Sequence, residues 1–193
     1  MLKNLNIFYK KKILIYGLGK SGLSVLKFLK KNNEINTHDD KVKADIKKLI
    51  KIKFDYIIIS PGIDINRCNL SNFLKRNHDK IYTDLDIFYE NHKENNKITI
   101  TGTNGKSTTA KILYEALKDQ KVDVRLVGNI GNPILLEKKV TSKTVFVIEA
   151  SSYQLEYSKL FKSNISVILN ISPDHLERHK TINKYISAKF KLV

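Results

Sequence analysis

Several features that would assign a protein of 193 residues to a special class are rare or missing in this sequence. The only cysteine is Cys68, which excludes an internal disulfide framework and fits a reducing compartment. No apolar run approaches the roughly 18–20 residues of a membrane-spanning helix. The first residues, MLKNLNIFYKKK, lack the apolar core and cleavage site of a secretory signal. We therefore expect a soluble cytoplasmic protein without a membrane span.

Arginine is also scarce, although the chain is strongly basic. It has 31 lysines and only 4 arginines against 19 acidic residues, which gives a net charge of +16. Proteins that read bases or phosphates specifically depend on the bidentate arginine side chain. Lys, Asn and Ile together make up 74 residues, which indicates a biased composition rather than a nucleic-acid-binding surface. We expect no nucleic-acid partner, but the positive field favours anionic ligands such as nucleotides.

The chain alternates short apolar runs with amphipathic stretches, a pattern typical of an α/β fold with parallel sheets. A polar stretch at 92–97 divides it, so we predict a Rossmann-like domain over 1–93 and a truncated P-loop ATPase-type α/β domain over 94–193. The predicted strands are 13–16, 35–38, 56–59, 80–83, 98–101, 122–127, 144–149 and 165–170. The predicted helices are 23–29, 41–53, 69–77, 84–92, 106–118, 153–161 and 180–190.

The strongest local motif lies between a predicted strand and a predicted helix. Its glycines let backbone N–H groups face phosphate oxygens, and its lysine and the helix N-terminus add positive charge. A serine hydroxyl follows where Mg²⁺ bridges two phosphates. The fit is to a short G-x-x-G-K-S pattern, because Ile100 stands where the longer pattern has its first glycine. The alternative is a glycine turn that caps a helix. The loop comprises Gly102, Thr103, Asn104, Gly105, Lys106, Ser107 and Thr108.

A second glycine-rich segment, GLGKSG at 17–22, matches G-x-G-x-x-G between the first strand and the first helix. Asp39 follows at the end of the second strand, where an acidic residue can bind a ribose hydroxyl. Because UDP-sugars and NAD both carry a ribose and a pyrophosphate, the motif does not separate them. Close packing of strand on helix without a ligand is the remaining alternative.

Two further strand ends carry acidic or histidine side chains. Glu149 ends an apolar strand at the edge where α/β proteins bind ligands, and a carboxylate there suits Mg²⁺. The alternative is an acidic strand end followed by a helix-capping serine. His175 and His179 are four residues apart, a spacing that zinc can use, but the sequence offers no evident third ligand.

Six segments together resemble the Mur ligase family over essentially the whole chain. They are GLGKSG, SPGI, GTNGKST, GNIGNP at 128–133, EASSYQLE at 149–156 and NISPDHLERH at 170–179. SSYQLE and GNIGNP resemble the branch that adds D-glutamate. The resemblance implies an ATP-dependent ligase that joins D-glutamate to UDP-N-acetylmuramoyl-L-alanine through an acyl phosphate. That reaction belongs to peptidoglycan precursor synthesis, and so to the cell wall, cell shape, cell division and the cell cycle.

The resemblance also implies a role for individual residues. ATP and two Mg²⁺ ions are the implied cofactors, and the phosphate loop would hold ATP. The implied catalytic residues are Lys106, Asn129, His175 and Lys189, the last in a segment that resembles that of the family's carbamylated lysine. The implied metal ligands are Ser107, Glu149, His175 and carbamylated Lys189. The implied UDP-sugar residues are Gly19, Lys20, Ser21, Gly22, Asp39, Asp40, Lys41, Ser60, Pro61, Gly62, Asn129 and Ser151.

Members of this family have three domains and over twice this length. We therefore expect a fragment or a truncated gene product, monomeric and inactive alone, with strands 145–148 and 165–169 leaving an exposed edge or face. Two other functions compete with the ligase. A folylpolyglutamate-synthase-like ligase would not need the GLGKSG domain. A non-catalytic module that binds a nucleotide or a UDP-sugar is the second alternative.

Overall fold

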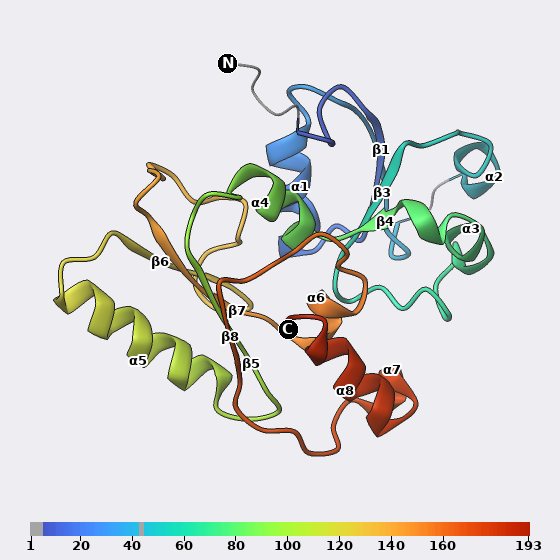
Figure 1. The fold of residues 1–193 in the computed structure, drawn as a ribbon. Coiled ribbons are helices and arrows are strands. Elements are labelled where there is room, and N and C mark those ends of the chain that lie inside the picture. Colours follow the sequence, from blue (N-terminus) through green and yellow to red (C-terminus); the bar gives the residue numbers. More distant parts are fainter. Residues whose placement is uncertain (1–5, 43–44) are drawn as a thin grey trace.

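A computed structural model describes residues 6–42 and 45–193, and it contains two parallel four-stranded sheets with helices around them (Figure 1). The predicted α/β fold is therefore confirmed. In the described part of the chain, no helix combines the length and the apolar character needed to cross a membrane.

The first sheet has the strand order β2-β1-β3-β4. Its centre is β1, whose residues 13–16 are fully buried, as expected of an apolar strand covered on both faces. The strands are β1 (Lys12–Tyr16), β2 (Glu34–His38), β3 (Tyr56–Ile59) and β4 (Ile81–Tyr82). The helices are α1 (Lys20–Leu29), α2 (Ile46–Leu49), α3 (Ser71–Arg76) and α4 (Asp84–Asn91), with a 3₁₀ turn over His78–Lys80.

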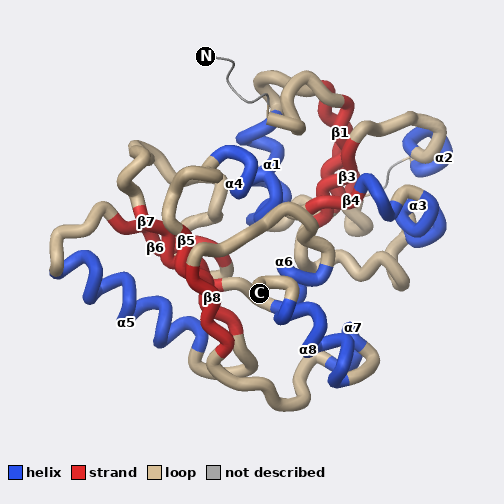
Figure 2. The backbone as a smooth tube through the Cα atoms, in the orientation of Figure 1, coloured by secondary structure: helices blue, strands red, loops and turns tan. Residues whose placement is uncertain are grey.

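The second sheet has the strand order β6-β7-β5-β8. Figure 2 shows it between α5 on one side and α6 and α8 on the other. The strands are β5 (Lys97–Thr101), β6 (Val124–Gly128), β7 (Val145–Glu149) and β8 (Ile165–Ile168). The helices are α5 (Lys106–Asp119), α6 (Ser152–Glu156), α7 (Leu176–His179) and α8 (Ile182–Phe190).

Two predicted helices are much shorter than the sequence indicated. In place of a helix over 41–53, α2 has a single turn capped by Asp45, whose side chain accepts from the Lys48 amide; residues 43 and 44 lie outside the described part. In place of a helix over 153–161, α6 ends at Glu156 because the amides of residues 159–161 turn toward the buried carboxylate of Asp86. A tertiary contact thus overrides the local pattern.

The polar stretch at 92–97 is packed rather than loose. Asn95 is buried and its side-chain amide donates to the carbonyls of Thr141 and Thr144 at 2.7 and 3.0 Å. The largest cluster of buried apolar residues also contains members of both halves, and the rings of Phe88 and Phe146 meet edge to face at 4.8 Å. The domain boundary at 93/94 stays a prediction. One apolar cluster spans the two sheets, and two smaller clusters are separate from it.

The expected exposure of two strands is half correct. β7 lies inside the sheet between β6 and β5, and its residues 146–149 are fully buried, so the prediction for 145–148 is wrong. β8 is an edge strand, and Ile165 at its start is 54% exposed. The two strands differ in exposure because β7 is an inner strand of the sheet and β8 is an edge strand. The hydrophobic pattern of the sequence does not reveal the order of the strands.

Candidate nucleotide and metal site

The loop between β5 and α5 has the backbone conformation that a phosphate loop requires. Gly105 precedes α5 at φ +81° and Gly102 leaves β5 at φ +153°, a region that side chains with a Cβ rarely enter. Asn170, just beyond β8, fastens the loop from the side: it accepts from the Asn104 amide at 2.9 Å and donates to the Asn104 carbonyl at 3.1 Å. Asn170 belongs to the NISPDHLERH segment, but its contact with the loop depends on the pairing of β8 with β5, which the sequence does not reveal.

The side chain of Lys106 folds back over this loop. Its ammonium donates to the carbonyls of Gly102 and Thr103 at 2.9 and 2.7 Å. These two bonds hold a positive charge at the mouth of the loop, beside the N-terminus of a helix of 14 residues. Charge and helix dipole therefore act in the same direction on an anion.

Three segments far apart in the sequence meet at Glu149. The fully buried carboxylate at the end of β7 accepts from the Ser107 hydroxyl and from the Asn129 side-chain amide, both at 2.8 Å. Asn129 reaches this position because Gly128 has φ +107° and a Cβ there would lie 2.3 Å from the Glu149 carbonyl oxygen. Ser107, Asn129 and Glu149 were all predicted site residues, and the structure brings them together. Both partners of the carboxylate are neutral, so a cation can compensate its charge.

Lys189 lies on α8 against the base of the phosphate loop. It is 1% exposed, and its ammonium donates to the Gly102 carbonyl at 2.8 Å and contacts the Thr101 hydroxyl at 3.4 Å. Burial, and to a lesser extent the charge of Lys106, lower the pKa of Lys189 to about 8. At neutral pH about one tenth of such a group is the free amine, the form that can add CO₂.

The two histidines four residues apart occupy different environments. His175 is half exposed at φ +53°, its ring lies 4.8 Å from that of Tyr153, and its described ionic neighbours, Asp174 and Glu177, do not belong to the Glu149 group. His179 is buried beside the Ser152 hydroxyl at 3.0 Å, and burial lowers its pKa. The described residues contain no group of three or more His, Cys, Asp and Glu side chains that could hold a metal ion.

The glycine-rich loop of the first sheet opens onto a cavity of about 450 Å³. A second cavity of about 400 Å³ shares four of its lining residues and continues toward Gln154. Ten of the twelve predicted UDP-sugar residues line the first cavity, and only Gly22 and Ser151 do not. The lining is Gly17, Gly19, Lys20, Ser21, Asp39, Asp40, Lys41, Ser60, Pro61, Gly62, Ile63 and Asn129.

Several of the predicted substrate residues also have structural roles, among them Gly22, Asp39 and Ser151. A Cβ on Gly22 would lie 1.8 Å from the Gly17 carbonyl oxygen, so this glycine allows α1 to pack on the loop. Asp39 accepts from the amides of Leu18 and Lys41 at 2.7 and 3.0 Å, and these bonds lower its pKa. Ser151 caps α6, because its hydroxyl accepts from the Gln154 amide.

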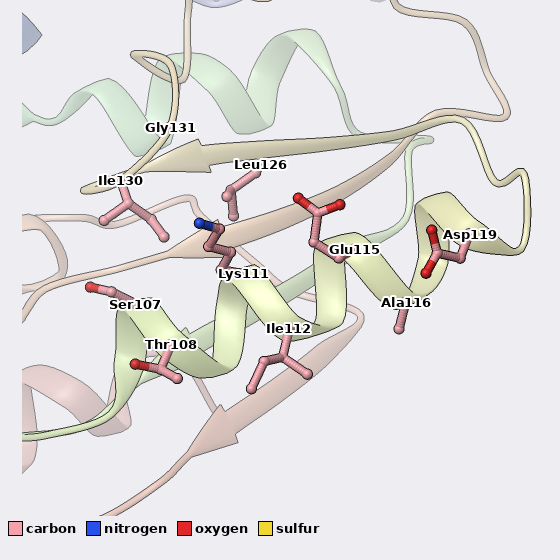
Figure 3. A pocket seen from close by; sticks show the side chains of 10 residues that line it. All are labelled: Ser107, Thr108, Lys111, Ile112, Glu115, Ala116, Asp119, Leu126, Ile130 and Gly131. Carbon is pink, nitrogen blue, oxygen red and sulfur yellow. The ribbon is translucent and has the colours of Figure 1, made fainter.

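A larger cavity, of about 800 Å³, lies elsewhere in the described part of the chain. Figure 3 shows it as a groove along α5, with Ser107 and Thr108 at one end and Asp119 at the other. Apolar side chains from α5 and β6, among them Ile112 and Leu126, line much of it. It meets the phosphate loop only at its end, and its few charged side chains do not converge on one point. We therefore place the candidate site at the two smaller cavities and the Glu149 group.

Comparison with known proteins agrees with this geometry. Residues 100–193 match the family model described as the Mur ligase middle domain. These residues are a Mur ligase middle domain. The match begins inside β5 and includes the phosphate loop, the Glu149 group and Lys189, so the resemblance noted in the sequence is confirmed.

Relatives extend the match to the first sheet. The UDP-N-acetylmuramoylalanine--D-glutamate ligase of Rickettsia felis is 37% identical over 97% of this chain and 44% of its own length. That of Caldicellulosiruptor saccharolyticus is 36% identical over 95% of the chain and 45% of its own length. The chain thus spans less than half the length of these Mur ligases.

A solved structure supports the fold alone. The crystal structure of UDP-N-acetylmuramate:L-alanyl-gamma-D-glutamyl-meso-diaminopimelate ligase from Neisseria meningitides superposes with a TM-score of 0.58 at 15% identity. The match covers 95% of this chain and 68% of the other. Both sheets, and not only residues 100–193, therefore share the fold of that structure.

Proposed function

We propose that the chain is the amino-terminal part of an ATP-dependent ligase that joins D-glutamate to UDP-N-acetylmuramoyl-L-alanine during peptidoglycan precursor synthesis. The observation that carries the proposal is the position of Asn129. It lines both cavities of the glycine-rich loops and donates to Glu149 beside the phosphate loop. A substrate held in the cavities would therefore end next to a nucleotide held by the loop.

On the nucleotide side, the loop would hold the ATP phosphates. Lys106 would exchange its two carbonyl partners for phosphate oxygens. Ser107 and Glu149 would hold one Mg²⁺, which fits their oxygen donors and the uncompensated buried carboxylate. Bound Mg²⁺ would neutralise phosphate charge, so that an attacking carboxylate is not repelled.

Lys189 and His175 would take part in a second ion site. The neutral amine of Lys189 would add CO₂ and release a proton, which converts a buried cation into an anionic oxygen ligand. A pKa near 8 supports this step, because the free amine is the reacting form. His175 would join the site through a change in the 175–180 segment, since its described contacts lie away from Glu149.

On the substrate side, Lys20 lies in both cavities beside the N-terminus of α1 and would pair with the pyrophosphate. Asp39 would act mainly by fixing the loop, since both of its oxygens already accept backbone amides. Asn129 contributes a wall of this cavity from the other sheet. A ligand held between the two sheets must extend toward the ATP proposed for the phosphate loop. This requirement favours a UDP-sugar over NAD.

In the proposed reaction, the alanine carboxylate of the UDP-sugar attacks the γ-phosphate and ADP leaves. The amine of D-glutamate then displaces phosphate from the acyl phosphate and forms the amide. Asn129 and Lys106 would contact the meeting point of the two anions. The expected compartment is the cytoplasm, where ATP and the UDP-sugar are found together.

Calorimetric titration of this chain with UDP-N-acetylmuramoyl-L-alanine and with NAD⁺ tests the substrate class. We expect saturable binding of the UDP-sugar, weakened about tenfold by Lys20→Ala, because a charge-assisted phosphate contact contributes about 1.4 kcal/mol. The matched control is Lys27→Ala, an exposed lysine of the same helix, which should change the affinity less than twofold. Saturable NAD⁺ binding without a UDP-sugar response would overturn the proposal.

A further inference from the structure

Arg178, in the short helix α7, connects the two sheets. Its side chain is 7% exposed, and its Nε donates to the Glu156 carboxylate at 2.9 Å. A terminal nitrogen of the same guanidinium donates to the carbonyl of Ile63 at 2.6 Å, 115 residues away. The guanidinium plane also lies over the ring of Tyr153, at 5.2 Å from its centre. One side chain therefore contacts α6 and a loop of the other sheet at once.

The loop that it reaches belongs to the nucleotide-sugar cavity. Ile63 lines that cavity directly after the 60–62 turn, which lines it as well. Ser60 ties the turn to the glycine-rich loop by donating to the Gly17 carbonyl at 2.7 Å. A ligand that moves either loop would consequently move the carbonyl that Arg178 holds.

At its other end, Arg178 contacts the same aromatic ring as His175. The segment is short and strained, because α7 has four residues and both flanking residues, His175 and Lys180, have positive φ. Backbone bonds and two side-chain contacts tie the segment to α6: the Tyr153 hydroxyl donates to Glu177 at 2.9 Å, and His179 Nε2 lies 3.0 Å from the Ser152 hydroxyl. The His175 ring lies against Tyr153, the same ring that the guanidinium covers on α6. Displacement of Arg178 would shift both rings together.

We propose that Arg178 is a positioning residue that couples the nucleotide-sugar cavity to His175. When the 60–63 loop closes on a ligand, the Ile63 carbonyl moves the guanidinium, and α7 and His175 move with it. The coupling rests on the proposed function only for the identity of the ligand. Lysine cannot replace arginine in this role, because a single ammonium lacks the planar fork that reaches Glu156 and Ile63 in two directions.

Nuclear magnetic resonance on the chain with labelled histidine and backbone tests this coupling. In the unmodified chain, UDP-N-acetylmuramoyl-L-alanine should shift the amides of the 60–63 loop and also the ring signal of His175. In Arg178→Lys, the amide shifts should remain, with an affinity within about threefold, and at least half of the His175 shift should be lost. In the control variant Glu156→Gln, which keeps the bond to Ile63, the His175 shift should persist.

The outcomes are distinct. A His175 shift that survives Arg178→Lys, or that is missing while the loop amides respond, overturns the coupling. A chain whose loop amides do not respond to the UDP-sugar refutes the proposed function instead. The ligand-free spectra then decide the coupling: Arg178→Lys must shift both the Ile63 amide and the His175 ring. A change confined to α6 and α7 would assign Arg178 a purely local structural role.

Discussion

The carboxylate of Asp86 is the most heavily bonded side chain between the two halves of the described chain. One oxygen accepts from the Ser158 hydroxyl and from the amides of residues 159, 160 and 161, at 2.7–3.2 Å. The other oxygen accepts from the amide and the hydroxyl of Thr83 at 2.8 and 3.1 Å, which caps α4. The residue is fully buried, so water cannot replace these bonds.

We predict that Asp86→Ala lowers the free energy of unfolding by about 4 kcal/mol. Each bond to a charged acceptor contributes about 1.5–3 kcal/mol, and removal of one member of a buried network costs about 3–5 kcal/mol, because its partners stay buried without an acceptor. Asp86→Asn should cost about half as much. Its one carbonyl oxygen can still face residues 158–161, but its NH₂ group then faces the Thr83 amide and the cap is lost.

Urea denaturation at pH 7 measures this, followed by far-UV circular dichroism and by the fluorescence of the tyrosines, since the sequence has no tryptophan. Asp79→Ala is the matched control, because Asp79 is an exposed acidic residue in the 3₁₀ turn before the same helix. Its loss should stay below about 0.5 kcal/mol. A loss below about 1 kcal/mol for Asp86→Ala would show that residues 157–161 reach their conformation without this carboxylate, and would refute the reasoning.

Three further predictions follow from burial and packing. The pKa of Lys189 is lowered to about 8, so the unfolded chain binds more protons than the folded chain between pH 8 and 10.5, and the free energy of unfolding should rise across that window. Urea denaturation at a series of pH values should show a smaller rise in Lys189→Met. An unchanged rise in that variant would contradict the prediction. Burial raises the pKa of Asp84 to about 6, so stability should fall from pH 4 to 6, and Asp84→Asn should remove about 2 kcal/mol of that fall in the same assay. Thermal denaturation should show that Gly22→Ala lowers the free energy of unfolding by more than about 2 kcal/mol, because its Cβ would meet the Gly17 carbonyl. Gly19→Ala, whose Cβ would enter open space, should lower it by less than about 1 kcal/mol. Equal losses of stability would refute the packing argument.

The sequence predicted those parts of the site that local chemistry determines. A strand that ends just before Gly102 and a helix that begins at Lys106 must form a loop with inward amides, and the structure has that loop. Glu149 could be placed at the carboxyl end of the sheet for the same reason, because an acidic residue that ends a buried strand lies there. These predictions need neighbours in the sequence only, so they did not depend on the order of the strands.

Contacts between distant segments could not be predicted in this way. Asp86 reads as an ordinary acidic residue near the start of a helix, and nothing near it in the sequence reveals the amides of residues 159–161 that it binds. The same contact ended α6 earlier than its apolar pattern indicated. Arg178 could be quoted as part of a motif, but its partner Ile63 is 115 residues away and offers only a backbone carbonyl, which leaves no trace in composition or spacing.

Asn129 shows how a local signal and a distant contact combine. GNIGNP contains two glycines with positive φ, and the first of them, Gly128, allows the chain to pass so close to the Glu149 carbonyl that any Cβ would clash. The glycine is visible in the sequence, whereas the strand it approaches is not. Because of this approach, Asn129 both bonds the Glu149 carboxylate and lines the cavity of the other sheet. The connection between the two proposed binding sites therefore depends on one backbone conformation at Gly128, and a substituted residue there would separate the sites without removing any side chain that contacts a ligand.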